Sequence, residues 1–101
     1  MAERAGVRVE EKTMRAINAA MENTRLQILF LLGERGSMYV GDIAAHFSIS
    51  RPAISHHLKI LKSSDLVKSV RKGQEIFYQV NRSHLAFILR TIADAMQRCC
   101  S

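Results

Sequence analysis

Residues 43–64 contain no carboxylate, although arginine, lysine, histidine and serine side chains are frequent among them. The spacing of Ile54, Leu58 and Leu61 at i, i+4 and i+7 predicts a helix over residues 51–62 with one buried face. A solvated helix usually mixes both signs of charge, whereas a surface that binds phosphates and base edges avoids acids. The expected chemistry is therefore binding to nucleic acid, carried on the other faces of this helix by Arg51, Ser55, His56, Lys59 and Lys62.

A tight turn and a shorter helix precede this one. Ser50 is expected to cap the longer helix, because its hydroxyl can accept a hydrogen bond from a free backbone N–H. Pro52 falls in the first turn, where a missing N–H costs nothing. Residues 41–47 predict the shorter helix and residues 48–50 the turn, in which Ile49 is expected to pack into the core. The unit predicted is a helix-turn-helix, which places its second helix in the major groove of DNA; the alternative is a cationic surface helix of a small bundle.

Two short strands follow. Residues 66–70 and 75–80 alternate in polarity or carry β-branched side chains, and residues 71–74 form the connecting turn, in which Gly73 can supply a positive φ. One alternative for this hairpin is a solvated tip without a binding role. We favour a wing that contacts phosphates or the minor groove through three cations near its tip, Lys68, Arg71 and Lys72.

The segment ISRPAISHHLKILKSSDLV, followed by KGQEIFYQV, resembles the ArsR/SmtB family of bacterial winged-helix repressors. The resemblance covers roughly residues 14–98, and the pattern GDIA-HF-IS-P-ISHHL is similar to autorepressors of the SdpR type. It implies a mainly α fold with a small β-hairpin, a winged helix-turn-helix in the order helix, helix, short strand, helix, helix, strand, strand, helix. It also implies a transcriptional repressor that binds double-stranded DNA at an inverted-repeat operator as a homodimer.

The helix-turn-helix and the resemblance together assign roles to the polar side chains. Ser50 would mainly cap its helix, and His57 would pack at the helix edge. The residues expected to lie against base edges are Arg51, Pro52, Ser55 and His56. Phosphate contacts are expected from Lys59, Lys62, Arg71 and Lys72. A winged-helix module that binds another protein is the alternative function, because a fold does not fix a function.

Amphipathic helices are predicted near both ends of the chain. The first spans residues 10–21 and has on one side Met14, Ile17, Ala20 and Met21. The last spans residues 83–98, with Ser83 as its cap, and carries a stripe of Leu85, Ile88, Leu89, Ile92 and Met96. A winged-helix core does not need two such helices, so we expect them to form the interface of a twofold dimer. The alternative is that they complete a monomeric core.

A third helix lies between these predicted elements. Residues 25–34 are apolar almost all round, which is typical of a helix buried in the core. The Asn-Thr pair at residues 23–24 is expected to cap it, and Gly36 to end it. Residues 38–40 predict a short strand before the helix-turn-helix.

Length and composition bound the remaining choices. A chain of 101 residues predicts one domain, here residues 10–98, with a flexible segment at residues 1–9 and a tail with two cysteines at residues 99–101. The net charge of +6 fits a polyanionic partner, although it does not distinguish nucleic acid from a membrane surface. No apolar run reaches the ~18 residues of a membrane span, and no secretory signal pattern is present, so a cytoplasmic location without a membrane partner is expected. No phosphate loop, nucleophile elbow or carboxylate pair indicates an enzyme.

Many proteins of the ArsR/SmtB family release DNA when a metal binds. One version uses a Cys-x-Cys box in the first helix of the motif, but residues 40–43 contain no sulfur. The other version uses an Asp and a His near the start of the last helix, with a His and a Glu from the far end of the partner's helix. Of these four positions only one keeps its ligand here, His84, and the other three are occupied by Arg82, Ala95 and Arg98. Arginines repel a cation, so no metal cofactor is expected at either site.

Two adjacent thiols remain at the end of the chain. Cys99 and Cys100 could bind a metalloid or be oxidised, which would make the protein a thiol-responsive repressor. If the terminal helices paired antiparallel, the partner's His84 could supply a third ligand. The alternative is an inert tail.

Overall fold

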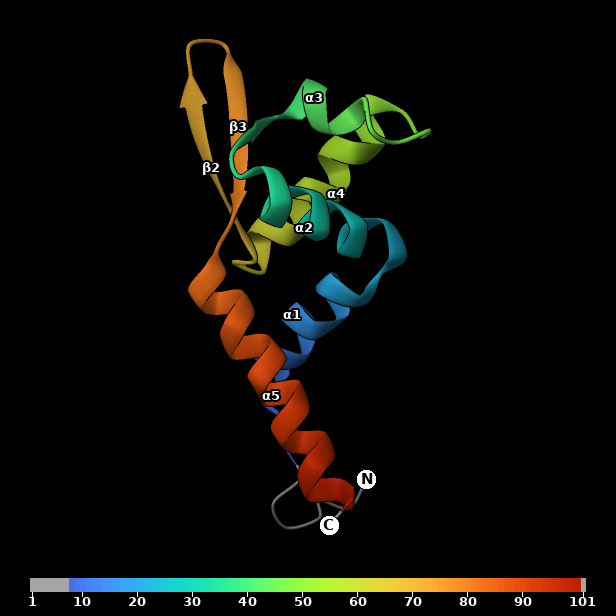
Figure 1. The fold of residues 1–101 in the computed structure, drawn as a ribbon, viewed down its shortest axis with the longest axis vertical. Coiled ribbons are helices and arrows are strands. Elements are labelled where there is room, and N and C mark those ends of the chain that lie inside the picture. Colours follow the sequence, from blue (N-terminus) through green and yellow to red (C-terminus); the bar gives the residue numbers. More distant parts are fainter. Residues whose placement is uncertain (1–7, 101) are drawn as a thin grey trace.

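The computed structural model describes residues 8–100, with side chains described through residue 98. Most of the segment expected to be flexible, and the thiols of Cys99 and Cys100, therefore lie outside the described residues. The elements follow the predicted order, which confirms a mainly helical winged helix-turn-helix fold (Figure 1). They are α1 (Glu11–Met21), α2 (Asn23–Arg35), β1 (Met38–Tyr39), α3 (Val40–Ala44), α4 (Arg51–Ser63), β2 (Val67–Lys72), β3 (Glu75–Val80) and α5 (Arg82–Cys100).

The three strands form one antiparallel sheet in the order β1-β3-β2. The hairpin of β2 and β3 stands at one end of the molecule (Figure 1) and is the predicted wing. Its strands pair up to Lys72 and Glu75, so the connecting turn contains two residues rather than the four expected. Gly73 is the first of the two and has a φ of 65°, which is the position at which a type II′ turn takes glycine.

The core lies between the helices and the inner face of the sheet. Ile54, Leu58 and Leu61 are fully buried, as the periodicity of α4 predicts. The other fully buried large side chains come from α2, α3, the segment before β2, and α5, and are Ile28, Leu32, Ile43, Leu66 and Ile88. Each element that reaches the core therefore contributes one face, which is the usual basis of a small domain with a single core.

The two end helices bury only part of the stripes predicted for them. In α1 the buried side chains are Thr13, Ala16, Ala19 and Ala20, whereas Met14 and Met21 are exposed. In α5 Ile88 is buried, but Leu89 and Met96 on the same stripe are exposed. Figure 1 shows α5 extending away from the rest of the molecule with α1 beside it. Neither α5, the longest helix, nor any other in residues 8–100 is both long and apolar enough to span a bilayer.

The interpretation of α2 as a wholly buried helix is wrong on one side. Ile28, Leu29 and Leu32 are buried, but Phe30 is 66% exposed. Phe30 borders a hollow of about 80 Å³ between α1, α2 and α5, whose walls are almost entirely apolar.

Two predicted helix caps are also wrong. The Asn-Thr pair lies inside α2, and the cap is Glu22, whose side chain accepts a hydrogen bond from the Arg25 backbone N–H at 2.9 Å. At the start of α5 the capping side chain is Asn81 rather than Ser83, because Asn81 Oδ1 faces the His84 backbone N–H at 3.5 Å. Gly36 ends α2 with a φ of 85°, as predicted.

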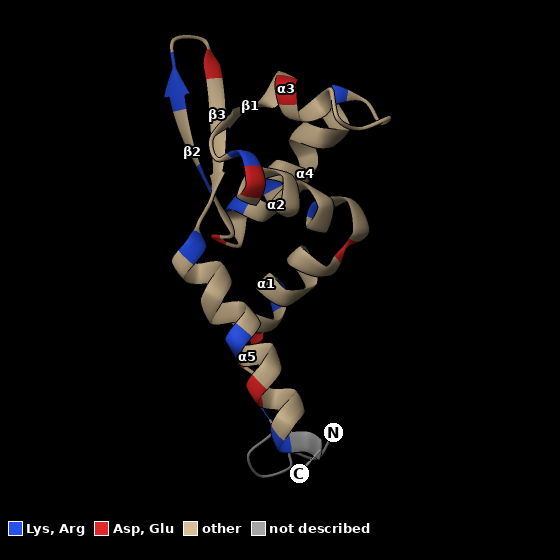
Figure 2. Cartoon of the chain, in the orientation of Figure 1, with Lys and Arg blue, Asp and Glu red and all other residues tan. Residues whose placement is uncertain are grey.

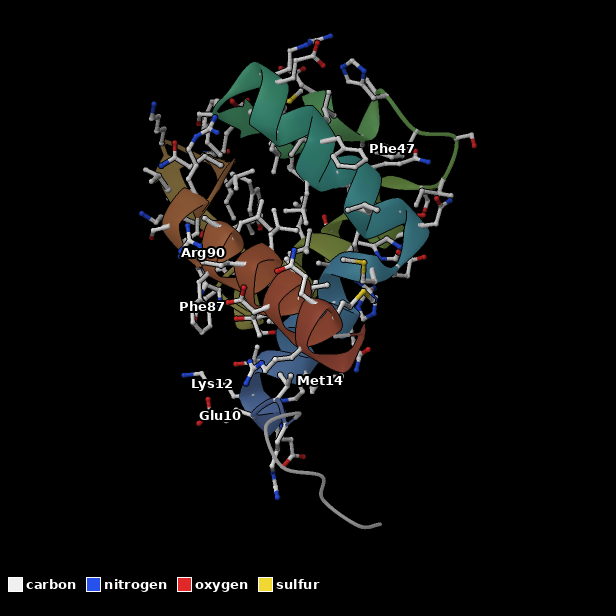
Figure 3. All side chains as sticks on the ribbon, turned by 60° about the horizontal axis from the view of Figure 1, so that its bottom comes forward. Glu10, Lys12, Met14, Phe47, Phe87 and Arg90 are labelled. Atoms are coloured by element: carbon white, nitrogen blue, oxygen red, sulfur yellow. The ribbon has the colours of Figure 1, made fainter. Side chains whose placement is uncertain are left out.

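The turn of the helix-turn-helix differs in detail from its prediction. Helix α3 ends at Ala44, and a tighter turn follows in which the Phe47 N–H donates to the Ala44 carbonyl at 3.1 Å. Figure 3 shows Phe47 turned toward the helices, where it packs against the core. Ile49 is 40% exposed, contrary to the expectation that it would pack into the core; Phe47 packs there instead.

Candidate nucleic-acid interface

Helix α4 is fixed at its start and along its buried face. Ser50 Oγ accepts a hydrogen bond from the Ala53 N–H at 3.3 Å, and Pro52 lies in the first turn, as predicted. The buried face contacts α1, α2, α3 and β2. The opposite face of α4 is covered by no other described element and is therefore free to meet a partner.

The exposed face of α4 brings most of the predicted residues together. Pro52, His56 and Lys59 follow at i, i+4 and i+7 and are all exposed. Arg51 and Lys62 are exposed at one edge of this stripe. Ser55 lies at the same edge and is partly buried, so only part of its side chain is accessible. Figure 2 shows carboxylates on α3 and at the start of β3, while α4 itself carries none.

The wing carries the other predicted cations. Arg71 and Lys72 are exposed at the end of β2, next to the turn (Figure 2). Arg71 Nε donates to the Gly73 carbonyl at 3.2 Å, so its side chain folds across the turn. Lys72 Nζ lies 5.1 Å from the centre of the Phe77 ring, within the range of a cation–π contact.

Sequence reasoning missed Tyr39, which holds the first residue of α4. Arg51 Nη2 donates to Tyr39 Oη at 3.0 Å, and the guanidinium carbon lies 5.3 Å from the centre of the ring. Gly41 makes room for this ring, because a Cβ atom there would lie 2.5 Å from Tyr39 Cε2. An aromatic residue two positions before a glycine was the only signal in the sequence.

His57 faces away from the exposed stripe and toward α2. Arg25 Nη1 lies 3.1 Å from His57 Nδ1, and Arg25 Nε donates to the Ala19 carbonyl at 2.7 Å. A guanidinium can only donate, so His57 Nδ1 is the acceptor in this pair. Glu22 lies beside them, and the hydrogen bond from the Arg25 backbone N–H holds the pKa of its carboxyl below the ordinary value. These contacts agree with the expectation that His57 packs at the helix edge.

His84, the one histidine considered as a metal ligand, lies at the start of α5. Its ring stacks on Phe87, with 6.1 Å between the ring centres and an angle of 20° between the planes. Among the described residues no group of three or more His, Cys, Asp or Glu side chains is arranged to hold a metal ion. The thiols of Cys99 and Cys100 lie outside those residues, and their role stays a prediction.

Comparisons with known sequences agree with this geometry. Residues 22–69 match the model of bacterial regulatory proteins of the arsR family. The transcriptional repressor SdpR of Bacillus subtilis is 51% identical over 67 residues, which are 66% of this chain and 73% of the relative. An arsenical resistance operon repressor of Staphylococcus aureus is 36% identical over 81 residues, 77% of each protein.

Solved structures give the same similarity over most of the chain. A possible transcriptional regulator for arsenical resistance has a TM-score of 0.74 and 35% identity, covering 81% of this chain and 83% of the other. A homodimeric winged helix-turn-helix DNA-binding domain from Mycobacterium bovis has a TM-score of 0.68 and 27% identity, covering 93% of this chain and 94% of the other.

Proposed function

Because the chain belongs to the ArsR family of bacterial regulatory proteins, we propose that it is a transcriptional repressor that binds double-stranded DNA as a homodimer. The observation that carries this proposal is the exposed face of α4, which is rich in donors and free of carboxylates. Such a face can lie between two phosphate backbones without repulsion. A cytoplasmic location is part of the proposal, because a regulator of this kind must reach the DNA. A catalytic role is not part of it.

The proposed contacts divide into two groups. Pro52, Ser55 and His56 face base edges in the major groove, where side chains distinguish the four base pairs. Arg51 begins the same helix, but its guanidinium is turned to Tyr39, which favours a phosphate over a base edge. Ser50 caps α4, and the cations proposed to bind phosphates are Lys59, Lys62, Arg71 and Lys72.

The apolar faces left on the end helices support pairing of two copies. Met14 and Met21 on α1 and Leu89 and Met96 on α5 are exposed, and Phe30 of α2 borders the same hollow as Met21 and Leu89. Exposed apolar side chains gathered on one face of a small domain indicate an interaction surface. A twofold dimer would place two copies of α4 in successive major grooves, about 34–36 Å apart, so the operator should be an inverted repeat.

The test begins with selection of duplexes from a random library by the purified protein. We expect the selected duplexes to share an inverted repeat and to bind far more tightly than a scrambled duplex of equal length. Failure of the wild-type protein to prefer any duplex over the scrambled one would exclude the repressor and leave the protein-binding alternative.

A double variant then locates the DNA-facing surface. Ser55→Ala with His56→Ala should weaken binding to the selected duplex by about 1–3 kcal/mol for each lost base contact, with a smaller effect on the scrambled duplex. Ser64→Ala, a truncation just beyond the end of α4, is the matched control and should keep the wild-type ratio. Equal losses on both duplexes would show that α4 does not contact the bases through these two side chains.

A further inference from the structure

Four side chains form a continuous row that joins the start of α4 to the tip of the wing. The Tyr39 and Phe77 rings lie at the centre, with 6.0 Å between their centres and an angle of 48° between their planes. Arg51 lies over the Tyr39 ring at one end, and Lys72 lies over the Phe77 ring at the other. The two cations come from different elements, and the aromatic pair lies between them.

Strand pairing places this row on the outer face of the sheet. Tyr39 and Phe77 are directly opposite each other in the ladder of β1 and β3. The next pair, Met38 and Tyr78, points to the other face and is buried in the core. Because successive side chains of a strand point to opposite faces, Tyr39 and Phe77 must face outward, where both are only partly buried.

Gly41 of α3 leaves the space in which the Tyr39 ring lies. A Cβ atom at Gly41 would lie 2.5 Å from Tyr39 Cε2 and 3.0 Å from Cζ, so the ring occupies the space that a side chain would take. Phe77 contacts the ring from the sheet. The hydroxyl lies beside the first turn of α4, where Arg51 Nη2 donates to it at 3.0 Å.

The hydrogen bond between Arg51 and Tyr39 leaves one proton unused. The guanidinium has no acceptor, so Arg51 Nη2 donates into a lone pair of Tyr39 Oη, and the Tyr39 hydroxyl keeps its own proton for another acceptor. Among the described residues no carboxylate forms an ion pair with Arg51. The start of α4 adds the positive end of a helix dipole at the same place. The three features together suit an anionic oxygen.

We propose that Tyr39 and Arg51 bind one phosphate of the DNA backbone together, and that Tyr39 thereby sets how the start of α4 enters the groove. This proposal rests on the proposed DNA-binding function. The Tyr39 hydroxyl donates to a phosphate oxygen while it accepts from Arg51, and a free N–H of the guanidinium reaches the same phosphate. Tyr39 is thus a DNA-contacting residue and also a positioning residue for Arg51, while Lys72 at the other end of the row binds a phosphate beside the wing.

The first experiment removes only the hydroxyl. Tyr39→Phe should weaken binding to the selected duplex and to a scrambled duplex by a similar factor, about three- to tenfold, because one hydrogen bond to a phosphate is lost. The dependence of affinity on salt should not change, because tyrosine is neutral and displaces no counterion. Arg51→Ala should lower that salt slope by about 0.9. The matched control is Tyr78→Phe on the opposite face of the sheet, which should bind both duplexes like the wild type.

The second experiment tests whether the two residues share one phosphate. Combining Tyr39→Phe with Arg51→Ala should cost less than the product of the two separate losses, because the second change acts on a contact already broken. Ethylation of individual phosphates should identify one position per half-site at which modification weakens the wild type but not the double variant. Wild-type affinity in Tyr39→Phe, or a loss confined to the selected duplex, would overturn this inference while the repressor function stands. Absence of any DNA binding by the wild-type protein would instead overturn the function itself.

Discussion

If the end helices pair two copies of the chain, truncating an exposed apolar side chain on α5 should weaken the dimer by a calculable amount. Leu89 lies on the α5 stripe and is 52% exposed. A fully buried leucine side chain contributes about 1.5–3 kcal/mol, so burial of the remaining half in an interface adds about 0.8–1.5 kcal/mol. A twofold interface contains the residue twice, so Leu89→Ala should cost about 1.5–3 kcal/mol and raise the dissociation constant of the dimer about 10- to 150-fold.

Sedimentation equilibrium over a dilution series measures this constant directly. Val70→Ala is the matched control, because Val70 is 49% exposed but lies on the wing, at the other end of the molecule from the exposed part of α5. Its dissociation constant should equal that of the wild type, and circular dichroism should confirm that both variants remain folded. A Leu89→Ala dimer as strong as the wild type, or an equal effect of Val70→Ala, would refute the assignment of this face.

Three further outcomes follow from the structure. Lys72→Ala should weaken binding to all duplexes by a similar factor and reduce the salt slope by about 1. The control Gln74→Ala, which replaces a neutral side chain in the adjacent turn, should leave the slope unchanged, and filter binding over a range of salt distinguishes the two variants. Leu58→Ala should reduce the free energy of unfolding in urea by about 2–5 kcal/mol, because the side chain is fully buried, while Lys59→Ala should stay within about 0.5 kcal/mol of the wild type. Because a backbone hydrogen bond holds the pKa of Glu22 below its ordinary value of 4.5, the stability that this carboxylate contributes is present above pH 4.5 and is lost as the pH falls through the folded-state pKa. In urea titrations at several pH values, the stability advantage of the wild type over Glu22→Gln should therefore shrink on acidification, and an advantage that is constant with pH would contradict this.

The helix-turn-helix could be predicted from the sequence because its signals are local. Ser50 caps α4 and Pro52 lies in its first turn, and both act within the first few residues of that helix. The periodicity of Ile54, Leu58 and Leu61 then decides which face is buried. Once that face is known, the exposed positions follow from helical geometry, without knowledge of the other elements.

The contact between Tyr39 and Arg51 could not be predicted in the same way. It depends on the register of β1 against β3, which turns Tyr39 outward, and on the approach of α3 at Gly41. Neither is encoded by the residues next to Tyr39. A glycine two positions after an aromatic residue is a weak signal of such a contact, because glycine is also common in turns and at helix ends.

The end helices show what an apolar stripe in a sequence leaves open. The stripe predicts that a face of the helix is buried, but not whether the same chain or a second molecule covers it. In α1 the small residues Ala16 and Ala20 pack inside the domain, where close helix contact favours small side chains, while Met14 and Met21 are left exposed. The two methionines of the predicted stripe therefore remain exposed, as the proposed dimer interface requires.

Arg25 connects α1, a helix of the proposed dimer interface, with α4, the helix proposed to bind DNA. Its guanidinium donates to the Ala19 carbonyl at the end of α1 and lies 3.1 Å from His57 on α4. In a dimer that pairs through α1 and α5, the helix at the interface is therefore joined to the helix that enters the groove by a planar, rigid group rather than by a loop. We therefore expect a change that shifts α1 at such an interface to be transmitted through Arg25 to α4.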